Sequence, residues 1–289
     1  MQRSLIGFIE LLMTSVIWGV TYTVLKIALE YMNSFEVAFL RFFVASIFFI
    51  PIIFLKKEKY NFREILILIV LGGTGVFLYQ TLFIMGESGV SAGASSFIVS
   101  TEPIFIYILS LAMRDEKLGI PPILGIILST VGLIILIQPS DIGSGKMFYV
   151  ILIILAAISW AIYTIAGKSV LSRHDSLHVT SLSSIIGTAF LFPLAGFSSL
   201  VALVHGETYS ILSILFLGIG ATFLGYLLWF DGLKYVKPSI AGITLYITPF
   251  ITVFSAAIMI GEPLSPMLLV GGALIISGIA ISNIGGIKG

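Results

Sequence analysis

The chain contains no cysteine, and only 10% of its 289 residues are charged. Without cysteine it can form neither disulfides nor thiolate metal sites, and it has no cysteine nucleophile. The charged share lies far below the roughly 25% that is usual in soluble domains. Fifteen basic residues nearly balance fourteen acidic ones, and no basic cluster stands on a soluble segment. This distribution argues against a nucleic-acid partner, which requires a concentrated phosphate-neutralising surface.

Motifs of the common enzyme classes are also missing. The glycine-rich run at residues 71–75 lacks the lysine followed by serine or threonine that defines a phosphate-binding loop. The three histidines do not have the HExxH spacing of a zinc protease, and no serine stands in a nucleophile-elbow setting. We therefore expect no ATP-binding machinery, no metal, no cofactor and no enzymatic activity.

Apolar residues make up 58% of the chain and form long runs. Because about 20 apolar residues cross a bilayer as a helix, the runs predict an all-α, multi-pass membrane protein. The first run is longer than the core of a signal peptide and is interpreted as a retained span. Ten spans are expected, near residues 5–29, 35–55, 64–85, 92–112, 121–138, 147–168, 177–200, 211–233, 239–260 and 266–284.

Lysine and arginine gather on one side of these spans. Eleven of the fifteen fall on the side of the N-terminus, whereas the opposite side receives only Lys146. Since basic residues are enriched in cytoplasmic loops, the pattern predicts cytoplasmic termini in the cell membrane.

The sequence repeats itself once. Trp18 and Lys26 recur 142 residues later as Trp160 and Lys168. Farther along, the offset is 146 residues, and the matched pairs are Gly72 with Gly218, Gly86 with Gly232, Pro103 with Pro249, Glu116 with Glu262, Gly125 with Gly271 and Gly132 with Gly278. The repetition predicts two related halves.

The expected halves are residues 1–140 and 146–285, followed by a short cytoplasmic tail at 286–289. Five spans in each half is an odd number, so the halves must lie in opposite orientations. Inverted repeats of this kind are typical of transporters, with the substrate site at their interface and alternating access by rocking of one half against the other.

These motifs resemble the drug/metabolite transporter superfamily and, within it, the ten-span EamA-type family. The resemblance rests on Trp18-Gly19 with Lys26, on Leu40-Arg41, and on the proline, glutamate and glycine series that both halves carry. It implies two inverted five-helix repeats around a central cavity. It also implies export of small organic metabolites, such as amino acids or amphipathic compounds, driven by protons or by the solute's own gradient.

Two other functions remain open at this point. The chain could be a non-transporting membrane receptor or structural protein. It could also exchange sugar phosphates or nucleotide sugars, as other branches of the superfamily do, although the spans at 239–260 and 266–284 offer no lysine or arginine to a phosphate.

Glu102 and Pro103 lie in the middle of the span at 92–112. Proline has no amide hydrogen for the helix, so Pro103, like Pro249 in the second half, predicts a kink. An acid at this depth is a candidate binding site for a proton or an amine. The structural alternative is a protonated glutamic acid bonded to Thr101 or to a carbonyl that the proline frees.

Three further charged residues lie within predicted spans. Glu10 is followed by Thr14 and Trp18 at helical spacing, so it faces the cavity or lies at the cytoplasmic interface. Arg41 is a candidate for a substrate carboxylate, and Lys26 is a weaker one. Their alternatives are pairing with Glu36 or Glu30, with loop carbonyls, or snorkelling to the interface.

Aromatic and small polar residues complete the predicted cavity. Cavities for small solutes combine apolar walls with a few directed polar groups, whereas tryptophan and tyrosine also serve as interfacial anchors. The cavity candidates are Trp18, Tyr22, Tyr79, Gln80, Trp160, Tyr163 and Tyr246. A small-molecule solute, protons and the lipid bilayer are thus the expected partners.

Overall fold

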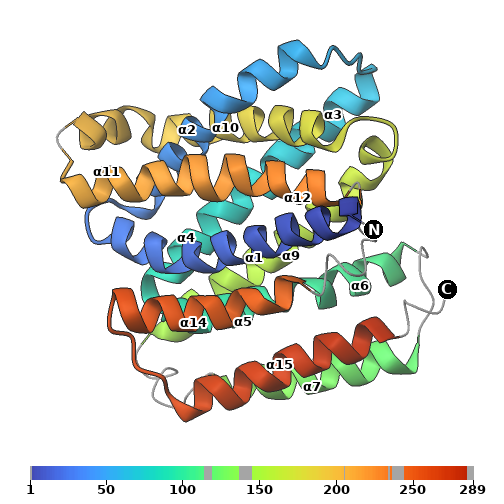
Figure 1. Cartoon of the computed structure of the whole chain (residues 1–289), viewed down its shortest axis with the longest axis vertical. Coiled ribbons are helices and arrows are strands. Elements are labelled where there is room, and N and C mark those ends of the chain that lie inside the picture. The colour runs from blue at the N-terminus through green and yellow to red at the C-terminus, as the bar shows by residue number, and fades with distance from the viewer. Residues whose placement is uncertain are drawn as a thin grey trace.

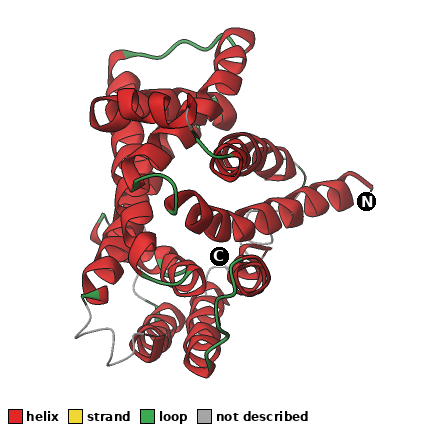
Figure 2. Ribbon diagram, turned by 90° about the vertical axis from the view of Figure 1, so that its left-hand side faces the viewer, coloured by secondary structure: helices red, strands yellow, loops and turns green. Residues whose placement is uncertain are grey.

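A computed structural model describes residues 2–113, 119–136, 145–204, 206–233, 235 and 244–284, and every regular element in these ranges is helical (Figures 1 and 2). The elements are α1 (Gln2–Leu29), α2 (Ser34–Leu55), α3 (Phe62–Leu71), η1 (Gly72–Leu78), α4 (Tyr79–Gly89), α5 (Ala92–Val99), α6 (Glu102–Ala112), α7 (Ile120–Leu136), α9 (Lys146–Leu171), α10 (Ser176–Val204), α11 (Thr208–Leu215), η2 (Phe216–Leu224), α12 (Gly225–Leu233), η3 (Leu245–Ile247), α14 (Thr248–Met259) and α15 (Pro266–Ile284).

Seven helical stretches among the described residues are long and apolar enough to cross a membrane, when Ala92–Ala112 is counted as one stretch across its turn at Ser100–Thr101. The predicted spans at 121–138, 239–260 and 266–284 fall on three shorter apolar helices, and residues 137–138 and 239–243 lie outside the described part. Large apolar side chains cover the outer surface; Leu55 and Ile258 are both 82% exposed. Such a surface suits lipid rather than water. The prediction of an all-α, multi-pass membrane protein is confirmed.

We name the two ends of the helix bundle for reference. The near end is the one where α1 begins, at the right of Figure 1, and the far end is the one where α1 finishes. Polar caps begin the helices at these ends. Asn33 and Asn61 each accept a backbone N–H of the following turn, while Glu36 and Glu64 bond back to the asparagine amides. These capping boxes fix where α2 and α3 start.

Two stretches of π-helix interrupt otherwise regular helices, and they begin near Gly72 and Gly218, which are 146 residues apart. A π-turn leaves a backbone carbonyl without its usual helical partner, and such turns are frequent at functional sites. Each stretch has a carbonyl that accepts a side-chain hydrogen bond, and that of Thr74 also accepts the Tyr79 backbone N–H. Ser159 donates to the Thr74 carbonyl at 2.8 Å, and the Trp18 indole donates to the Ala221 carbonyl at 2.9 Å.

Pro103 and Pro249 each stand in the first turn of a helix. At Pro103 the chain does more than bend, because α5 ends at Val99 and α6 starts afresh at Glu102. Proline is tolerated in the first turn since its missing amide would have no intrahelical partner there. The break brings Glu102 to the start of a helix at mid-span depth.

The longest helix pairing runs along α7 and α15, which lie side by side at the bottom of Figure 1. A Cβ added to Gly132 would meet the Gly271 carbonyl oxygen at 2.6 Å, and one added to Gly278 would meet that of Gly125 at 2.5 Å. Small residues let two membrane helices approach this closely.

Five more pairings position the site. Helix α2 lies against α10, where Ser46 and Thr188 share a hydrogen bond of 3.1 Å. Helix α1 packs on α12 and α14, and α9 packs on α4 and α6. Helices α1, α2, α4, α6, α9 and α12 thus surround the middle of the molecule.

Candidate functional site

A cluster of polar residues lies between these helices, and we call it the central cluster. Its members are Arg41, Gln80, Thr222 and Glu102. Its charged centre is Arg41 on α2, which is only 8% exposed. The Arg41 Nε donates to the Thr222 hydroxyl at 2.8 Å, and one terminal nitrogen contacts the Gln80 amide oxygen at 3.4 Å. Thr222 in turn donates to the Leu217 carbonyl within the π-turn η2. The irregular helix therefore positions the hydroxyl that holds the guanidinium.

Arg41 has no acidic partner in contact. Among the described residues no carboxylate lies within ion-pair distance of its guanidinium, and Glu36 instead closes the capping box of α2. A buried charge without a counter-ion costs several kcal/mol. The remaining donors of the guanidinium can therefore accept an anion as a partner.

Glu102 on α6 forms the acidic side of the central cluster. Its hydrogen-bond partner is the hydroxyl of Tyr79, whereas its Oε1 atom is buried and has no hydrogen bond within the described part of the chain. The Thr101 hydroxyl, one partner in the structural alternative, donates instead to the Ile98 carbonyl. Tyr22 on α1 lies within electrostatic reach of both Glu102 and Arg41. One acid and one base thus share a buried polar region.

Aromatic rings form one wall of this region. The ring of Tyr22 meets Phe83 at 5.5 Å, Phe83 meets Tyr79 at 5.8 Å, Tyr79 meets Trp160 at 5.1 Å, and Trp160 stacks on Tyr163 at 4.8 Å. Offset and edge-on ring pairs at these distances are favourable. Four of the predicted cavity residues therefore lie in one continuous arc.

Trp18, one helical turn before Tyr22 on α1, belongs to a second aromatic group. Its ring lies 6.0 Å from Tyr226 and 5.5 Å from Trp229, and its indole edge fills the space above Gly225. Tyr246, in η3, is half-buried and packs against the main hydrophobic core. The sequence predicted both as cavity residues, but neither touches the central cluster through a described contact.

Glu10 lies at the near end, away from the central cluster. It lines a cavity of about 560 Å³ together with Lys56, Asp175, Asp231 and leucines of α12. Eight residues, or about 12 Å of helix, separate Glu10 from Trp18. Charged side chains thus surround an opening between α1, α10 and α12.

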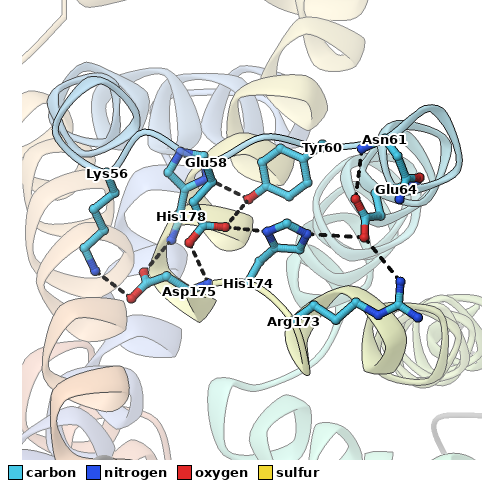
Figure 3. A network of polar contacts seen from close by, with 9 residues as sticks. All are labelled: Lys56, Glu58, Tyr60, Asn61, Glu64, Arg173, His174, Asp175 and His178. Carbon is cyan, nitrogen blue, oxygen red and sulfur yellow. Dashed lines mark hydrogen bonds and ion pairs between the residues drawn. The ribbon is translucent and has the colours of Figure 1, made fainter.

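A polar network lies at the near end beside this cavity (Figure 3). It joins the segment between α2 and α3 to the segment between α9 and α10. Lys56 and Asp175 form an ion pair of 2.7 Å, and Glu58 accepts the Asp175 backbone N–H at 2.9 Å. The nitrogens of His174 face two carboxylates, Nδ1 toward Glu58 and Nε2 toward Glu64.

Titration of the loop groups follows from these contacts. Burial alone would raise the pKa of Glu58, but bonds from the Asp175 amide and from His174 hold it below its usual range. The pKa of Asp175 is likewise lowered, since bonds from Lys56 and from the His178 amide outweigh burial. Burial and the neighbouring Glu58 raise the pKa of Tyr60, so its phenol stays neutral and bonds to His178 at 2.7 Å.

The sequence alone did not reveal two features. The near-end network depends on contacts between residues that are more than a hundred positions apart. Glu87, at the end of a predicted span, is fully buried with 0% exposure. Its only signal in the sequence was an acid seven residues after Gln80, on the same face of a helix.

Comparison with known proteins decides the family. The EamA-like transporter family matches residues 5–138 and 147–284. The chain belongs to this family. It is a membrane transporter, as the resemblance predicted, and the receptor and enzyme alternatives are set aside.

Relatives in the EamA-like family match over nearly their whole length. An "uncharacterized transporter" of Archaeoglobus fulgidus is 31% identical over 95% of this chain and 97% of its own. A "probable amino-acid metabolite efflux pump" of Salmonella typhimurium is 31% identical over 96% and 95%. A "probable terminal-alkyne amino-acid exporter" of Streptantibioticus cattleyicolor is 28% identical over 94% and 92%. One crystal structure matches with a TM-score of 0.63 at 15% identity, covering 99% of this chain and 98% of the other, which shows a shared fold.

Proposed function

We propose that the protein exports amino acids or closely related small amphipathic solutes across the cell membrane by alternating access. Both termini lie in the cytoplasm, ten spans form two inverted five-helix halves, and the solute binds between the halves. The names of the relatives, two of which are said to move amino-acid compounds outward, support this class of solute.

The observation that carries the proposal is the buried, unpaired guanidinium of Arg41. Its remaining donors can bind the carboxylate of an amino acid, and planar guanidinium and carboxylate groups fit each other in pairs of parallel hydrogen bonds. Thr222 and Gln80 hold the guanidinium in place before the solute arrives. Binding the solute therefore compensates a charge that is otherwise costly.

Glu102 recognises the basic end of the solute. Its buried Oε1 can accept a hydrogen bond from the ammonium group of the solute, or the carboxyl can carry a proton when the solute is absent. The same group thereby exchanges a proton for an amine, which couples export to the proton gradient. The arc from Tyr22 to Tyr163 offers an apolar wall to the solute's side chain.

Alternating access is supported by the doubled packing. Gly72 lies against Ile186 and Gly187 of α10. Its repeat partner Gly218, 146 residues later, lies against Val44 of α2. Val44 is in turn the repeat partner of Ile186, since the two are 142 residues apart. Two halves with matching contacts can exchange their arrangements, so that the cavity opens first at one end and then at the other.

Flux measurements test the proposal. The purified full-length protein is placed in sealed vesicles with an internal pH dye, and a panel of radiolabelled amino acids and amines is offered. We expect saturable movement of at least one amino acid in wild type, accompanied by protons, and none in Arg41→Met. Equal flux in wild type and Arg41→Met would refute the assignment of Arg41, and flux of sugar phosphates instead of amino acids would favour the alternative branch.

A further inference from the structure

Glu87 is a buried acid to which the proposed cycle has so far given no role. It lies on α4, two residues before that helix ends at the far end of the bundle, and it is 0% exposed. The hydroxyl of Ser95 on α5 donates to its Oε2 at 2.8 Å. Its Oε1 is buried and receives no hydrogen bond from any residue that the structure describes.

The charge of Glu87 is not neutralised by direct contact. The positive charges that act on Glu87 are those of Lys26 on α1 and, more weakly, Arg41. Glu262 is the acidic neighbour, and Tyr22 also lies within electrostatic reach. Among the described residues none of these groups forms an ion pair with Glu87 at contact distance. A buried carboxylate with one hydroxyl partner is expensive, whereas the neutral acid is tolerated. The neutral acid therefore suits this buried position better than the carboxylate does.

Glu87 continues the polar line that starts in the central cluster. It lies seven residues beyond Gln80 on α4, which is two helical turns or about 10 Å along the same face. On α1 the same direction leads from Tyr22 to Lys26, one turn farther toward the far end. Glu87 and Lys26 thus face each other where a solute leaves the central cluster for the far end.

The neighbouring contact shows what must separate. Glu262, in the segment between α14 and α15, accepts the Ala92 backbone N–H at the start of α5 at 2.9 Å. Helix α5 also carries Ser95, the hydrogen-bond donor to Glu87. Opening the far end by moving α1 and α14 away from α4 and α5 would let water reach Glu87 beside the lysine.

We infer that Glu87 is a second proton-binding carboxyl of the transporter, which takes up a proton when the far end closes and releases it when water and Lys26 meet it in the open state. The inference rests on the proposed function. It deepens that function by separating two tasks: Glu102 exchanges its proton for the solute, whereas Glu87 ties the opening of the far end to the proton gradient. Solute recognition does not depend on Glu87.

Two measurements test this inference in the full-length protein in vesicles. The first compares solute counterflow without a proton gradient and uphill accumulation with one, using the radiolabelled amino acid that wild type moves fastest. We expect Glu87→Gln to keep counterflow within a factor of about two and to lose at least about tenfold in accumulation. Glu30→Gln is the matched control, because Glu30 is an exposed acid at the same end of the bundle.

The second measurement needs no solute and no substitution at Glu87. Dicyclohexylcarbodiimide reacts with protonated carboxyls in apolar surroundings, and peptide mapping locates the modified residue. We expect Glu87 to be modified at neutral pH, with Lys26→Met extending the modification to more alkaline pH because it removes the cation that favours the carboxylate. Glu30 stays unmodified.

The outcomes separate the two claims. If wild type moves no amino acid, the proposed function fails, and the carbodiimide reaction still decides whether Glu87 holds a proton. If Glu87→Gln accumulates the solute as wild type does, or if Glu87 is unmodified at every pH while Glu102 reacts, the inference is wrong although the proposed function stands. Loss of counterflow together with accumulation in a folded Glu87→Gln protein also contradicts it, since Glu87 would then act in solute binding.

Discussion

The two segments that match the EamA-like family share their packing but not their charges. The first segment buries Arg41 and Glu87 and half-buries Glu102, whose Oε1 atom is inaccessible. At the offsets of 142 and 146 residues, the second segment places Ser183, Leu233 and Thr248.

The packing, in contrast, corresponds closely. Gly86 lies against Ile153 and the Tyr149 carbonyl. Its repeat partner Gly232, 146 residues later, lies against Leu11 and the Gly7 carbonyl. Leu11 and Gly7 stand 142 residues before Ile153 and Tyr149, so the two sets of contacts correspond. The doubled scaffold supplies close helix contacts on both sides, and the first segment alone supplies the charged residues of the central cluster. A solute with an acidic and a basic end therefore meets an asymmetric site inside a nearly symmetric frame.

The largest effect is expected at Arg41. Truncating one partner of a buried, hydrogen-bonded charge pair costs about 2 to 5 kcal/mol, so Arg41→Met should weaken solute binding at least about 30-fold. Ser183→Ala, at the matching position of the second segment, should change binding less than about twofold. Competition binding in detergent with labelled amino acid measures both. Comparable losses in the two variants would show that the segments contribute equally.

Glu102 should come next. Hydrogen bonds to charged groups contribute about 1.5 to 3 kcal/mol, so Glu102→Gln should reduce proton-coupled flux about tenfold or more. Thr248→Val is the control in the second segment, and its flux should remain close to wild type. Proton movement per solute, followed with the internal pH dye, distinguishes a coupling role from a structural one. If Glu102→Gln still moved protons together with the solute, Glu102 would have no part in proton coupling.

The shared scaffold is tested at its glycines. Gly132→Ala places a Cβ 2.6 Å from the Gly271 carbonyl, so α7 and α15 must move apart at a cost of about 1 to 3 kcal/mol. Gly73→Ala meets its nearest atom only at 3.8 Å and should leave stability unchanged. Thermal unfolding in detergent should show a lower midpoint for the first variant alone. Equal midpoints would mean that this helix pair contributes little.

The smallest effect is expected at the near-end network, which ties the first segment to the second. The side chains of Lys56 and Asp175 are 41% and 34% exposed, so Lys56→Met should cost no more than about 1 kcal/mol. Lys57→Met, at an exposed neighbouring lysine, should cost nothing.

The acid response of this network has a defined sign. The lowered pKa values of Glu58 and Asp175 mean that their contacts stabilise the folded state at neutral pH. That contribution is lost as the pH falls through the lowered values. Thermal midpoints should therefore converge for wild type and Lys56→Met in acid, and a constant difference would contradict this.

Much of the fold could be predicted from the sequence because apolar run length and small-residue spacing are local signals. The depth of Glu102 and Arg41 followed from their distance to the ends of their runs. The break at Ser100–Thr101, where a kink was expected, depends on how α5 and α6 pack on different neighbours. Glu87 was missed because its place near the end of a run suggests a solvated acid, and its burial comes from α5 and α9, which pack around it in space.

One measurement tests the account most directly: competition binding of the best amino acid from the panel, of its decarboxylated amine and of its N-acetyl derivative, in wild type, Arg41→Met and Glu102→Gln. We predict that wild type prefers the intact amino acid to both analogues. Arg41→Met should bind the amino acid and the amine equally well, but should still prefer the amino acid to the N-acetyl derivative. Glu102→Gln should bind the amino acid and the N-acetyl derivative equally well, but should still prefer the amino acid to the amine. If both variants weaken all three ligands equally, the two side chains support the fold and do not read the ends of the solute.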